Sequence, residues 1–369
     1  MTKKDFDVIS FGEIMLRLSP PSNERIVRGE VFHKCAGGSE LNVASGVSLL
    51  GLRTGIISKL PDNELGPYIK NHVRFQGVSD DYLVYDTSPT ARLGVYYYES
   101  GASPRKPAII YDRRYSSINT ISIDEIPDSV YTSTRVFHTS GITLASTSVV
   151  WTIWADPSYS TALYTTTTDQ DTKAETRTID EAAMEMIKRF KAGGAQISFD
   201  VNYRANLWSE EEAYNTITSI LPYVDILFIS EETSRRMFRK TGDLRDIMKS
   251  YCTEYGVDYV ATTQRTVISP KQHTFGSILY CSKDDAFFTE PPYENIDVVD
   301  RIGSGDAYVA GVLFGLLQYG DPQRALEFGD ATSSVKNTIP GDLPSSDFDE
   351  VTSIIRSHHS TGPQSELNR

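Results

Sequence analysis

The sequence lacks a long apolar segment. No run of apolar residues approaches the roughly 18 that a helix needs to span a bilayer. The first residues, MTKKDFDVISFGE, pass directly into a strand-like stretch and contain neither the apolar core nor the cleavage site of a signal peptide. We therefore expect a cytoplasmic protein without a membrane partner.

Cysteine is also scarce, with three residues in a chain of 369, at Cys35, Cys252 and Cys281. They lie far apart and form neither a CxxC pair nor a zinc-binding spacing. Ordinary reduced thiols are the expectation for such a set in an intracellular protein. The sequence thus favours neither a disulfide scaffold nor a structural zinc site.

Positive charge is in deficit. The chain carries 36 Lys and Arg residues against 49 Asp and Glu residues, for a net charge of −13. Nucleic-acid-binding proteins usually present a basic surface, so this balance argues against a nucleic-acid partner. It does not exclude an enzyme that binds anions in a local basic pocket.

Several common nucleotide and hydrolase motifs are missing. There is no GxxxxGK[ST] sequence of a P-loop and, near the glycines that follow Val298, no GxSxG sequence. The same glycines fail the GxGxxG pattern because Tyr308 stands at the last position. Any phosphate site in this chain must therefore be built in another way.

Strand-like and helix-like segments alternate through most of the chain. The opening run FDVISFGEIMLRLSP is predicted as a strand, GGSELNVASGVSLLGL as a helix and NELGPYIKNHVRFQG as another helix. Later apolar runs such as AQISFDVNY and VDILFISEE are nearly continuous, as in strands buried on both faces. The alternation predicts an α/β fold whose central, mostly parallel sheet is flanked by helices.

Three segments depart from this alternation. Residues 91–117, ARLGVYYYESGASPRKPAIIYDRRYSS, are predicted as a hairpin. Together with RIVRGEVFHKCAGG, this hairpin could form a small antiparallel lid that consists of segments 17–36 and 90–115. The alternative is an edge hairpin without function. The Thr-rich and aromatic insertion 147–177 has no role that we can assign, and 356–369 is predicted as a flexible tail with His358 and His359 solvated. We expect residues 1–355 to form one domain that contains the lid segments and the insertion.

The stretch DRIGSGDAYVAG places two glycines and an aspartate directly before a strongly apolar helix. Gly303, Ser304 and Gly305 would expose free backbone N–H groups where the helix dipole favours an anion. Asp306 beside such a nest could accept the proton of an attacking hydroxyl during phosphoryl transfer. The alternative, equally open on these residues, is that Asp306 merely caps the helix.

GGSELNVASGVSLLGL near the start and DRIGSGDAYVAG near the end together resemble the two signatures of the ribokinase-like, or PfkB, carbohydrate kinases. HTSGIT, SFDVNYRANLWSEEEA, LFISEE and KNTIPGD are most similar to the 2-keto-3-deoxygluconate kinases within that family. The resemblance implies a small β lid over the sugar, ATP and Mg²⁺ as cofactors, and phosphorylation of the terminal hydroxyl of a six-carbon sugar acid.

The resemblance also implies roles for individual residues. Asp306 is expected as the catalytic base, with Gly303, Ser304 and Gly305 as the anion hole. The residues expected to bind the substrate are Gly37, Gly38, Asn42, Tyr96, Tyr111, Arg113, Arg204 and Asp306. A planar guanidinium suits a carboxylate, so Arg204 is expected to hold the acid group. Arg17 suits an acidic substrate too, unless it is a strand arginine facing water.

On the nucleotide side, the expected contacts are Ser230, Thr263, Arg265, Gly303, Gly305 and Asn337. The metal-related N-x-x-E motif of the family reads SEET here, so Glu231 is expected to act only through metal-bound water. Arg301 replaces a threonine that is common in the family, which leaves the backbone nest intact. The resemblance leaves open whether K⁺ binds near the anion hole. The sequence also leaves open whether the chain forms a homo-oligomer.

Two alternatives to a 2-keto-3-deoxygluconate kinase remain on sequence grounds. One is a fructokinase or another sugar kinase of the same fold. The other belongs to a different class, a regulator that binds sugar and nucleotide without catalysis. The intact Asp306 behind an intact glycine loop argues for an enzyme.

Overall fold

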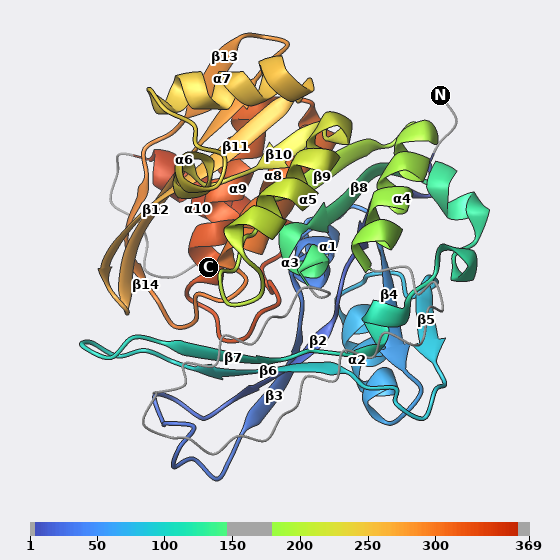
Figure 1. The fold of residues 1–369 in the computed structure, drawn as a ribbon. Helices are drawn as coiled ribbons and strands as arrows, with labels where there is room; N and C mark the ends of the chain where they lie inside the picture. Colours follow the sequence, from blue (N-terminus) through green and yellow to red (C-terminus); the bar gives the residue numbers. More distant parts are fainter. Residues whose placement is uncertain (1–3, 146–178, 361–369) are drawn as a thin grey trace.

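The computed structural model describes residues 4–145 and 179–360 and consists of two β-sheets with surrounding helices (Figure 1). The insertion 147–177 lies outside these residues. Within the described ranges, no helix combines the length and the apolarity that crossing a membrane requires.

The larger sheet has ten strands in the order β13-β12-β11-β10-β9-β8-β1-β4-β5, with β14 also paired to β12. These strands are β1 (Phe6–Phe11), β4 (Thr54–Pro61), β5 (Leu83–Asp86), β8 (Thr134–Ser140), β9 (Gln196–Asp200), β10 (Ile226–Phe228), β11 (Tyr259–Ser269), β12 (Gln272–Cys281), β13 (Ala286–Thr289) and β14 (Tyr293–Asp297). All pairs from β5 to β11 are parallel, and those of β12 are antiparallel. The predicted mostly parallel sheet is confirmed.

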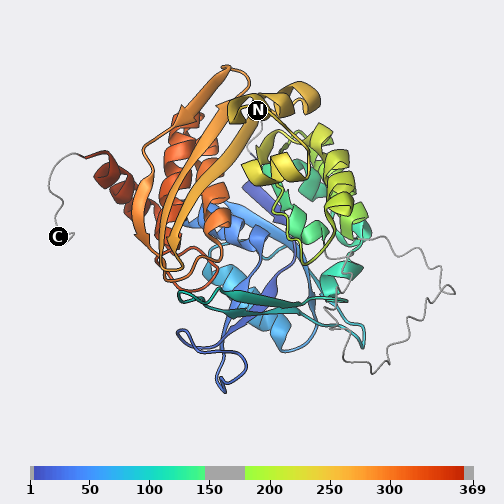
Figure 2. The same cartoon turned by 60° about the vertical axis from the view of Figure 1, so that its left-hand side comes forward.

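Helices cover both faces of this sheet (Figure 2). They are α1 (Ser39–Leu49), α2 (Leu65–Phe75), α3 (Gly141–Leu144), α4 (Ile179–Ala192), α5 (Glu210–Ile220), α6 (Glu231–Arg236), α7 (Leu244–Tyr255), α8 (Ser304–Tyr319), α9 (Pro322–Lys336) and α10 (Phe348–His359). Short 3₁₀ turns are η1 (Ser117–Thr120), η2 (Ile123–Glu125), η3 (Asp128–Thr132) and η4 (Leu221–Tyr223).

Successive residues of a strand serve different cores because their side chains alternate between the two faces. In β10, Leu227 packs with residues of α4, α5 and α7, whereas Ile226 and Phe228 pack with residues of α1 and α8. Both faces of the sheet are therefore buried, which explains why the strand sequences are apolar almost throughout.

The smaller sheet has four strands in the order β3-β2-β6-β7 and lies at the bottom of Figure 1. Its strands are β2 (Met15–Ser19), β3 (His33–Gly37), β6 (Gly94–Glu99) and β7 (Ala108–Asp112). The two predicted lid segments supply it. The expectation of an antiparallel lid was wrong in one respect, because β2 pairs with β6 in parallel.

The opening run is also not one strand. The chain leaves the large sheet after Phe11 and enters the small sheet at Met15, so β1 and β2 belong to different sheets. This short crossing ties the small sheet to the centre of the large one.

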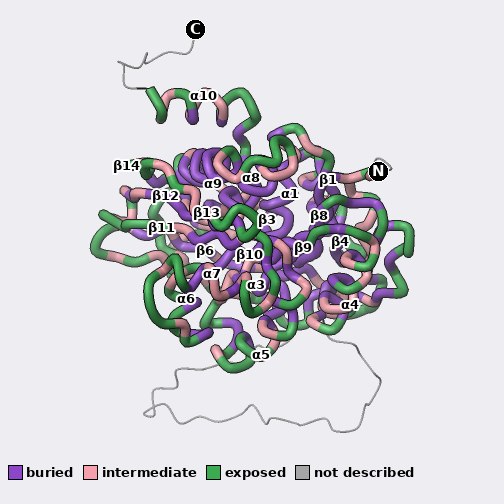
Figure 3. Tube along the Cα trace, turned by 90° about the horizontal axis from the view of Figure 1, so that it is seen from above, coloured by how far each residue is buried: buried purple, intermediate pink, exposed green. Residues whose placement is uncertain are grey.

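The C-terminal segment predicted as a tail is helical in its first part. Helix α10 continues to His359 along the edge of the molecule (Figure 3). His358 stacks on Tyr293 with ring centroids 3.8 Å apart, and its Nε2 lies 2.8 Å from the carbonyl oxygen of Pro291. The predicted tail boundary at 356 was therefore wrong, as was the expectation of a solvated His358.

Candidate active site

The glycine loop opens helix α8 as predicted. Gly303 is the N-cap residue with φ 81°, a left-handed conformation that favours glycine. A Cβ on Gly303 would lie 2.1 Å from the carbonyl oxygen of Asp342, so only glycine fits there. Gly305 is exposed in the first turn, where the N–H groups of α8 lack partners within the helix. This terminus can bind an anion.

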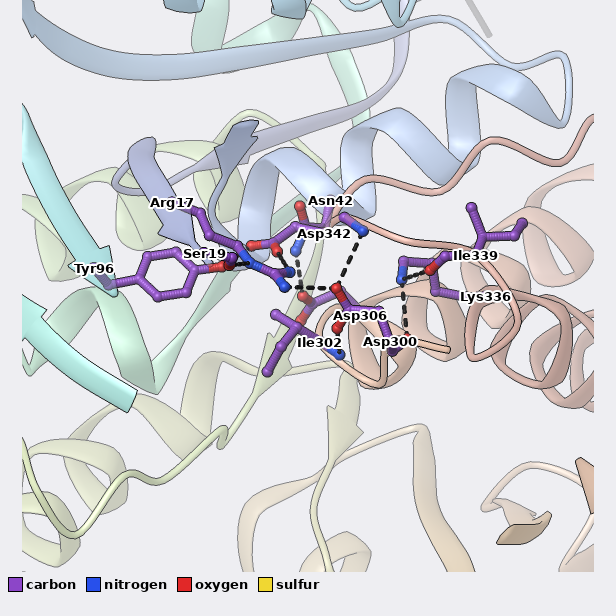
Figure 4. Close-up of polar contacts among 11 residues, drawn as sticks. Arg17, Ser19, Asn42, Tyr96, Asp300, Ile302, Asp306, Lys336, Ile339 and Asp342 are labelled. Carbon is purple, nitrogen blue, oxygen red and sulfur yellow. Dashed lines mark hydrogen bonds and ion pairs between the residues drawn. The ribbon is translucent and has the colours of Figure 1, made fainter. Parts of the chain in front are cut away.

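Asp306 does not cap α8. Among the residues that the structure describes, no side chain makes a capping hydrogen bond at this helix start. Instead, Asn42 Nδ2 donates to Asp306 Oδ2 at 2.7 Å, and Ser39 Oγ donates to Asp306 Oδ1 at 2.7 Å. Asn202 Nδ2 in turn donates to Ser39 Oγ at 2.9 Å. The interpretation of Asp306 as only a helix cap is therefore wrong, because two side chains of α1 orient its carboxylate. Figure 4 shows one of them, Asn42, beside Asp306.

Opposing influences act on the pKa of Asp306. Burial raises it above 3.8, whereas the hydrogen bonds from Asn42 and Ser39 and the charge of Arg204 lower it. Each carboxylate oxygen can accept more than one hydrogen bond, so the two donors leave room for a substrate hydroxyl. The group retains the chemistry of a base whose strength is set by its surroundings.

A cavity of 1010 Å³ lies beside the start of α8. The predicted residues Ser230, Thr263, Arg265, Arg204, Ser304 and Gly305 all line it, and so does Glu231. Because these residues come from the loop after β9, the start of α6, β11 and α8, the cavity lies beyond the carboxyl ends of parallel strands, where open α/β sheets usually bind ligands.

Three arginines line this cavity beside four carboxylates, two of which, Glu210 and Glu232, are paired with Arg236. Burial lowers the pKa of Arg265, and the neighbouring charges of Arg301 and Arg204 lower it further. Arg236 also lines the cavity. A bound phosphate would relieve the repulsion that Arg265 experiences from these neighbouring charges, so its position favours an anionic ligand.

The other residues predicted on the nucleotide side differ in their surroundings. Ser230 caps α6 by accepting from the Thr233 backbone N–H, and Glu231 forms an ion pair with Arg235. Asn337 does not line the cavity; it is buried, and its Nδ2 donates to the Ser333 carbonyl at 2.8 Å. The expected nucleotide contact of Asn337 therefore stays a prediction.

On the side of the small sheet, Tyr96 is buried and its hydroxyl donates to Asp342 (Figure 4). Tyr111 packs against it, with ring centroids 5.9 Å apart. A Cβ on Gly37 would lie 2.1 Å from Asp342 Oδ2, and Gly38 has φ 148°. The predicted sugar-binding turn and the lid tyrosines are thus brought together around Asp342.

Arg17 is not the strand arginine facing water that was one of the two expectations. It is only 4% exposed, and its NH2 and NH1 groups each lie 2.6 Å from a carboxylate, of Asp300 and of Asp342. Its guanidinium also lies 4.4 Å from the ring centroid of Tyr98. Because two carboxylates already bind its guanidinium, Arg17 cannot be the only residue that binds a substrate acid. It joins the small sheet to the glycine-loop region.

Arg113 and Arg204 differ in their availability. Arg113 is buried and paired with Glu13, whose Oε2 lies 2.6 Å from Arg113 Nε. A substrate contact of Arg113 stays a prediction and requires it to share its remaining donors. Arg204 is exposed at the cavity and donates at 3.1 Å to the carbonyl of its own neighbour, Tyr203. Its fork is the better placed of the two for a carboxylate.

Sequence reasoning missed several residues of the site. Ser39 and Asn202 form the chain that positions Asp306, and Asp300 and Asp342 hold Arg17. The signal that could have found them is their location, since all four lie within the motifs GGSELNV, DVNYR, DRIGSGD and IPGD.

The fold and the site together define an α/β protein in which a small β-sheet adjoins an anion-binding helix terminus, an aspartate and an arginine-lined cavity. The sequence matches the family described as pfkB family carbohydrate kinase over residues 5–156 and 174–347. The chain therefore belongs to this family of carbohydrate kinases. The match passes over the middle of the 147–177 insertion.

Three similar proteins indicate where in the family the chain lies. It is 32% identical over 350 residues to a 2-dehydro-3-deoxygalactonokinase of Haloferax volcanii, covering 95% of this chain and 96% of the relative. It is 25% identical to a 5-dehydro-2-deoxygluconokinase of Shouchella clausii over 96% of this chain and 97% of the relative. The crystal structure of a 2-dehydro-3-deoxygluconokinase from Thermotoga maritima superposes with a TM-score of 0.82 at 29% identity, covering 95% of this chain and 99% of that one. All three are kinases of six-carbon dehydro-deoxy sugar acids.

Proposed function

We propose that this protein transfers a phosphoryl group from ATP to the terminal hydroxyl of 2-keto-3-deoxygluconate. The named relatives support a sugar acid of this kind, since two of them are kinases of 2-dehydro-3-deoxy acids. The resemblance in the sequence motifs supports the gluconate-derived acid in particular. The galactonate-derived acid differs in stereochemistry and is the first competitor to test.

The observation that carries the proposal is the position of Asp306. Its carboxylate lies at the start of α8, held by Asn42 and Ser39, between the small sheet and the arginine-lined cavity. A hydroxyl bound from the side of the small sheet would meet a base, and a phosphate bound from the cavity would meet a helix N-terminus. Phosphoryl transfer needs these two things together.

The residues fit the cofactors that the family uses. The cavity offers arginines and helix N–H groups to the phosphates of ATP, and the carboxylates of Glu231 and Glu232 line it as well. Mg²⁺ prefers oxygen ligands and keeps several waters, so these glutamates would hold it through water. When bound, Mg²⁺ would neutralise charge on the phosphates.

The chain's own residues would carry the remaining steps. Asp306 would accept the proton of the attacking hydroxyl, which leaves that oxygen free to bond to the γ-phosphorus as the bond to the β-phosphate oxygen breaks. The N–H groups of the Gly303–Gly305 loop would stabilise the charge that develops on the transferred group. Arg204 would orient the substrate through its carboxylate.

The decisive experiment measures ADP release with a panel of acceptors. The panel contains the 2-keto-3-deoxy acids of gluconate and galactonate, 5-keto-2-deoxygluconate and fructose, each with ATP and Mg²⁺. The proposal requires the highest kcat/KM for the gluconate-derived acid. A preference for fructose would favour the fructokinase alternative, and saturable sugar binding without turnover of any acceptor would favour a regulator.

A further inference from the structure

Lys336, the last residue of α9, carries a buried ammonium group directly behind the glycine loop. The residue is 1% exposed, and Nζ lies 3.4 Å from the carbonyl oxygen of Asp300 and 3.2 Å from that of Ile339 (Figure 4). Lysine is almost never fully buried unless its charge is compensated. The position therefore calls for an explanation beyond packing.

The surroundings of Lys336 compensate its charge. Burial lowers the pKa of Lys336, and the carboxylates of Asp300, Asp342 and Asp306 act in the opposite direction, while Arg17 adds to the lowering. The ammonium thus lies among carbonyl oxygens and carboxylates, with one other buried cation nearby. Oxygen acceptors of this kind suit a monovalent cation.

One of the two carbonyl partners of Lys336, that of Asp300, belongs to the chain that leads into the anion-binding loop. The backbone N–H groups of Val299 and Asp300 donate to the carbonyl of Asn337 at 2.8 and 3.1 Å. Asp300 Oδ1 accepts from the Ile302 N–H at 3.1 Å, and Oδ2 accepts from the Gly341 N–H at 3.1 Å. The end of α9 and the residues before Gly303 are therefore held as one unit, with Lys336 at its centre.

Carbonyl oxygens are the groups with which proteins replace the hydration shell of K⁺. An ammonium group makes the same kind of contact with its N–H donors. The Lys336 ammonium already lies between such carbonyls, behind the loop that must hold the transferred phosphoryl group. A separate ion is therefore unnecessary at this position.

We propose that the Lys336 ammonium is a built-in monovalent cation that positions the Gly303–Gly305 loop, so that the enzyme works without added K⁺. Lys336 is a positioning residue, because it acts on the loop and does not touch the substrate. The kinetic part of this proposal rests on the proposed function. Its structural part, a cation site behind the loop, does not.

The first test compares cations in the wild-type enzyme and in Lys336→Ala. Wild-type kcat should agree within about twofold in K⁺, NH₄⁺, Na⁺ and tetramethylammonium chloride at equal ionic strength. Lys336→Ala leaves room for an ion, and in Na⁺ it should lose on the order of tenfold to a hundredfold in kcat, as expected for a displaced reacting group. K⁺ or NH₄⁺ should restore most of that loss. Lys336→Met fills the space without charge, so it should show the loss without the rescue.

The second test needs no substrate. The melting temperature of Lys336→Ala should rise when K⁺ replaces Na⁺, and that of the wild type should not change. Lys59→Ala is the matched control, because Lys59 is also buried, with Nζ 3.0 Å from the Thr120 carbonyl and 2.8 Å from Glu125, away from the glycine loop. Its melting temperature should fall without any preference between the two ions.

A wild-type kcat that is much higher in K⁺ than in Na⁺ would overturn the proposal. So would a Lys336→Ala variant whose rate and melting temperature both ignore the choice of ion. If that variant does not fold, the wild-type comparison and Lys336→Met decide. Failure of every acceptor in the ADP assay would refute the proposed function instead, and the melting experiment would still report on the cation site.

Discussion

Asn42 Nδ2 and Asp306 Oδ2 are joined by a hydrogen bond of 2.7 Å across 264 positions of the chain. Asn42 lies in GGSELNV near the start of the chain and Asp306 in DRIGSGD near its end, so distant parts of the chain complete one site. Ser39 adds a second donor from the same helix, α1. The carboxylate thus arrives oriented before any substrate binds, which is the pre-organisation that catalysis rewards.

We predict that Asp306→Asn lowers kcat by about 10²–10⁴, the usual contribution of general-base catalysis. The amide keeps the size of the side chain but cannot accept the proton. Nucleotide affinity, measured by calorimetry, should stay largely intact because the cavity is unchanged. Glu294→Gln, at an exposed position on β14, is the charge-matched control. A near-normal kcat for Asp306→Asn would remove Asp306 from the role of base.

The pH profile should report the same group. Asp306 must be ionised to act, and burial raises its pKa above 3.8, so kcat/KM should fall as the pH drops through that raised value. The positive charge of Arg204 lowers the pKa of Asp306. In Arg204→Ala the acid limb should therefore move to higher pH. Arg236→Ala, which also removes a cavity arginine, should leave the limb in place, and an equal shift in both variants would contradict the assignment.

Arg204 should also select the acidic substrate. Hydrogen bonds to charged groups contribute roughly 1.5–3 kcal/mol, so Arg204→Ala should lose on the order of tenfold to a hundredfold in kcat/KM for the keto-deoxy acid. Arg204→Lys keeps the charge without the fork and should lose less. The measured quantity is the ratio of kcat/KM for acid over fructose. A constant ratio while both activities fall would mean that Arg204 only supports general positioning.

The small sheet should become more protected when the sugar binds. Tyr96 reaches from β6 to Asp342, and β7 carries exposed residues such as Ile110, so this sheet joins the site on one side and faces solvent on the other. Hydrogen exchange with and without substrate should show added protection in segments 17–36 and 90–115. Strand β8, in the centre of the large sheet, is the internal control. Equal exchange in both states would argue against a lid.

The sequence predicted the parts of this molecule that depend on local patterns. Nearly continuous apolar runs predicted the buried parallel strands, and the glycines before an apolar helix predicted the anion-binding terminus at Gly303. The partners of Arg17 could not be predicted in this way, because Asp300 and Asp342 lie 283 and 325 positions away. Arg17 lies on β2, whereas Asp300 precedes α8 and Asp342 follows α9. The packing of the small sheet against these helices brings the three together, and no local pattern encodes that packing.

The end of α10 was missed for a related reason. Its helix buries only Val351 and Ile355, and polar residues such as Ser357 and His358 follow. Their helical state depends on contacts with the β13–β14 connection, where His359 Nε2 lies 3.1 Å from Glu290 Oε2. These contacts are tertiary, so composition alone suggested a tail.

A buried acidic group near this helix gives the last prediction. Asp330 in α9 is 0% exposed, and burial, with the nearby carboxylate of Glu290, raises its pKa to about 8 against the lowering effect of Ser277. Ser277 Oγ donates to Asp330 Oδ1 at 2.6 Å, whereas no group within residues 4–145 and 179–360 donates to Oδ2. The phenol of Tyr293 and the carboxylate of Glu327 add to this crowded region.

A group whose folded-state pKa is raised stabilises the fold at low pH and loses that contribution as the pH rises. For Asp330 the loss should extend from about pH 4, near the unfolded value, up to the folded value of about 8. Asp330→Asn cannot ionise, so its free energy of unfolding should rise relative to that of the wild type across this pH range. The gain from pH 5 to pH 9 should exceed about 1.4 kcal/mol, the equivalent of one pKa unit, in urea unfolding. Asp297→Asn, at an exposed position, should show no such change. A difference between Asp330→Asn and the wild type that stays constant with pH would mean that Asp330 is ionised in the folded protein throughout.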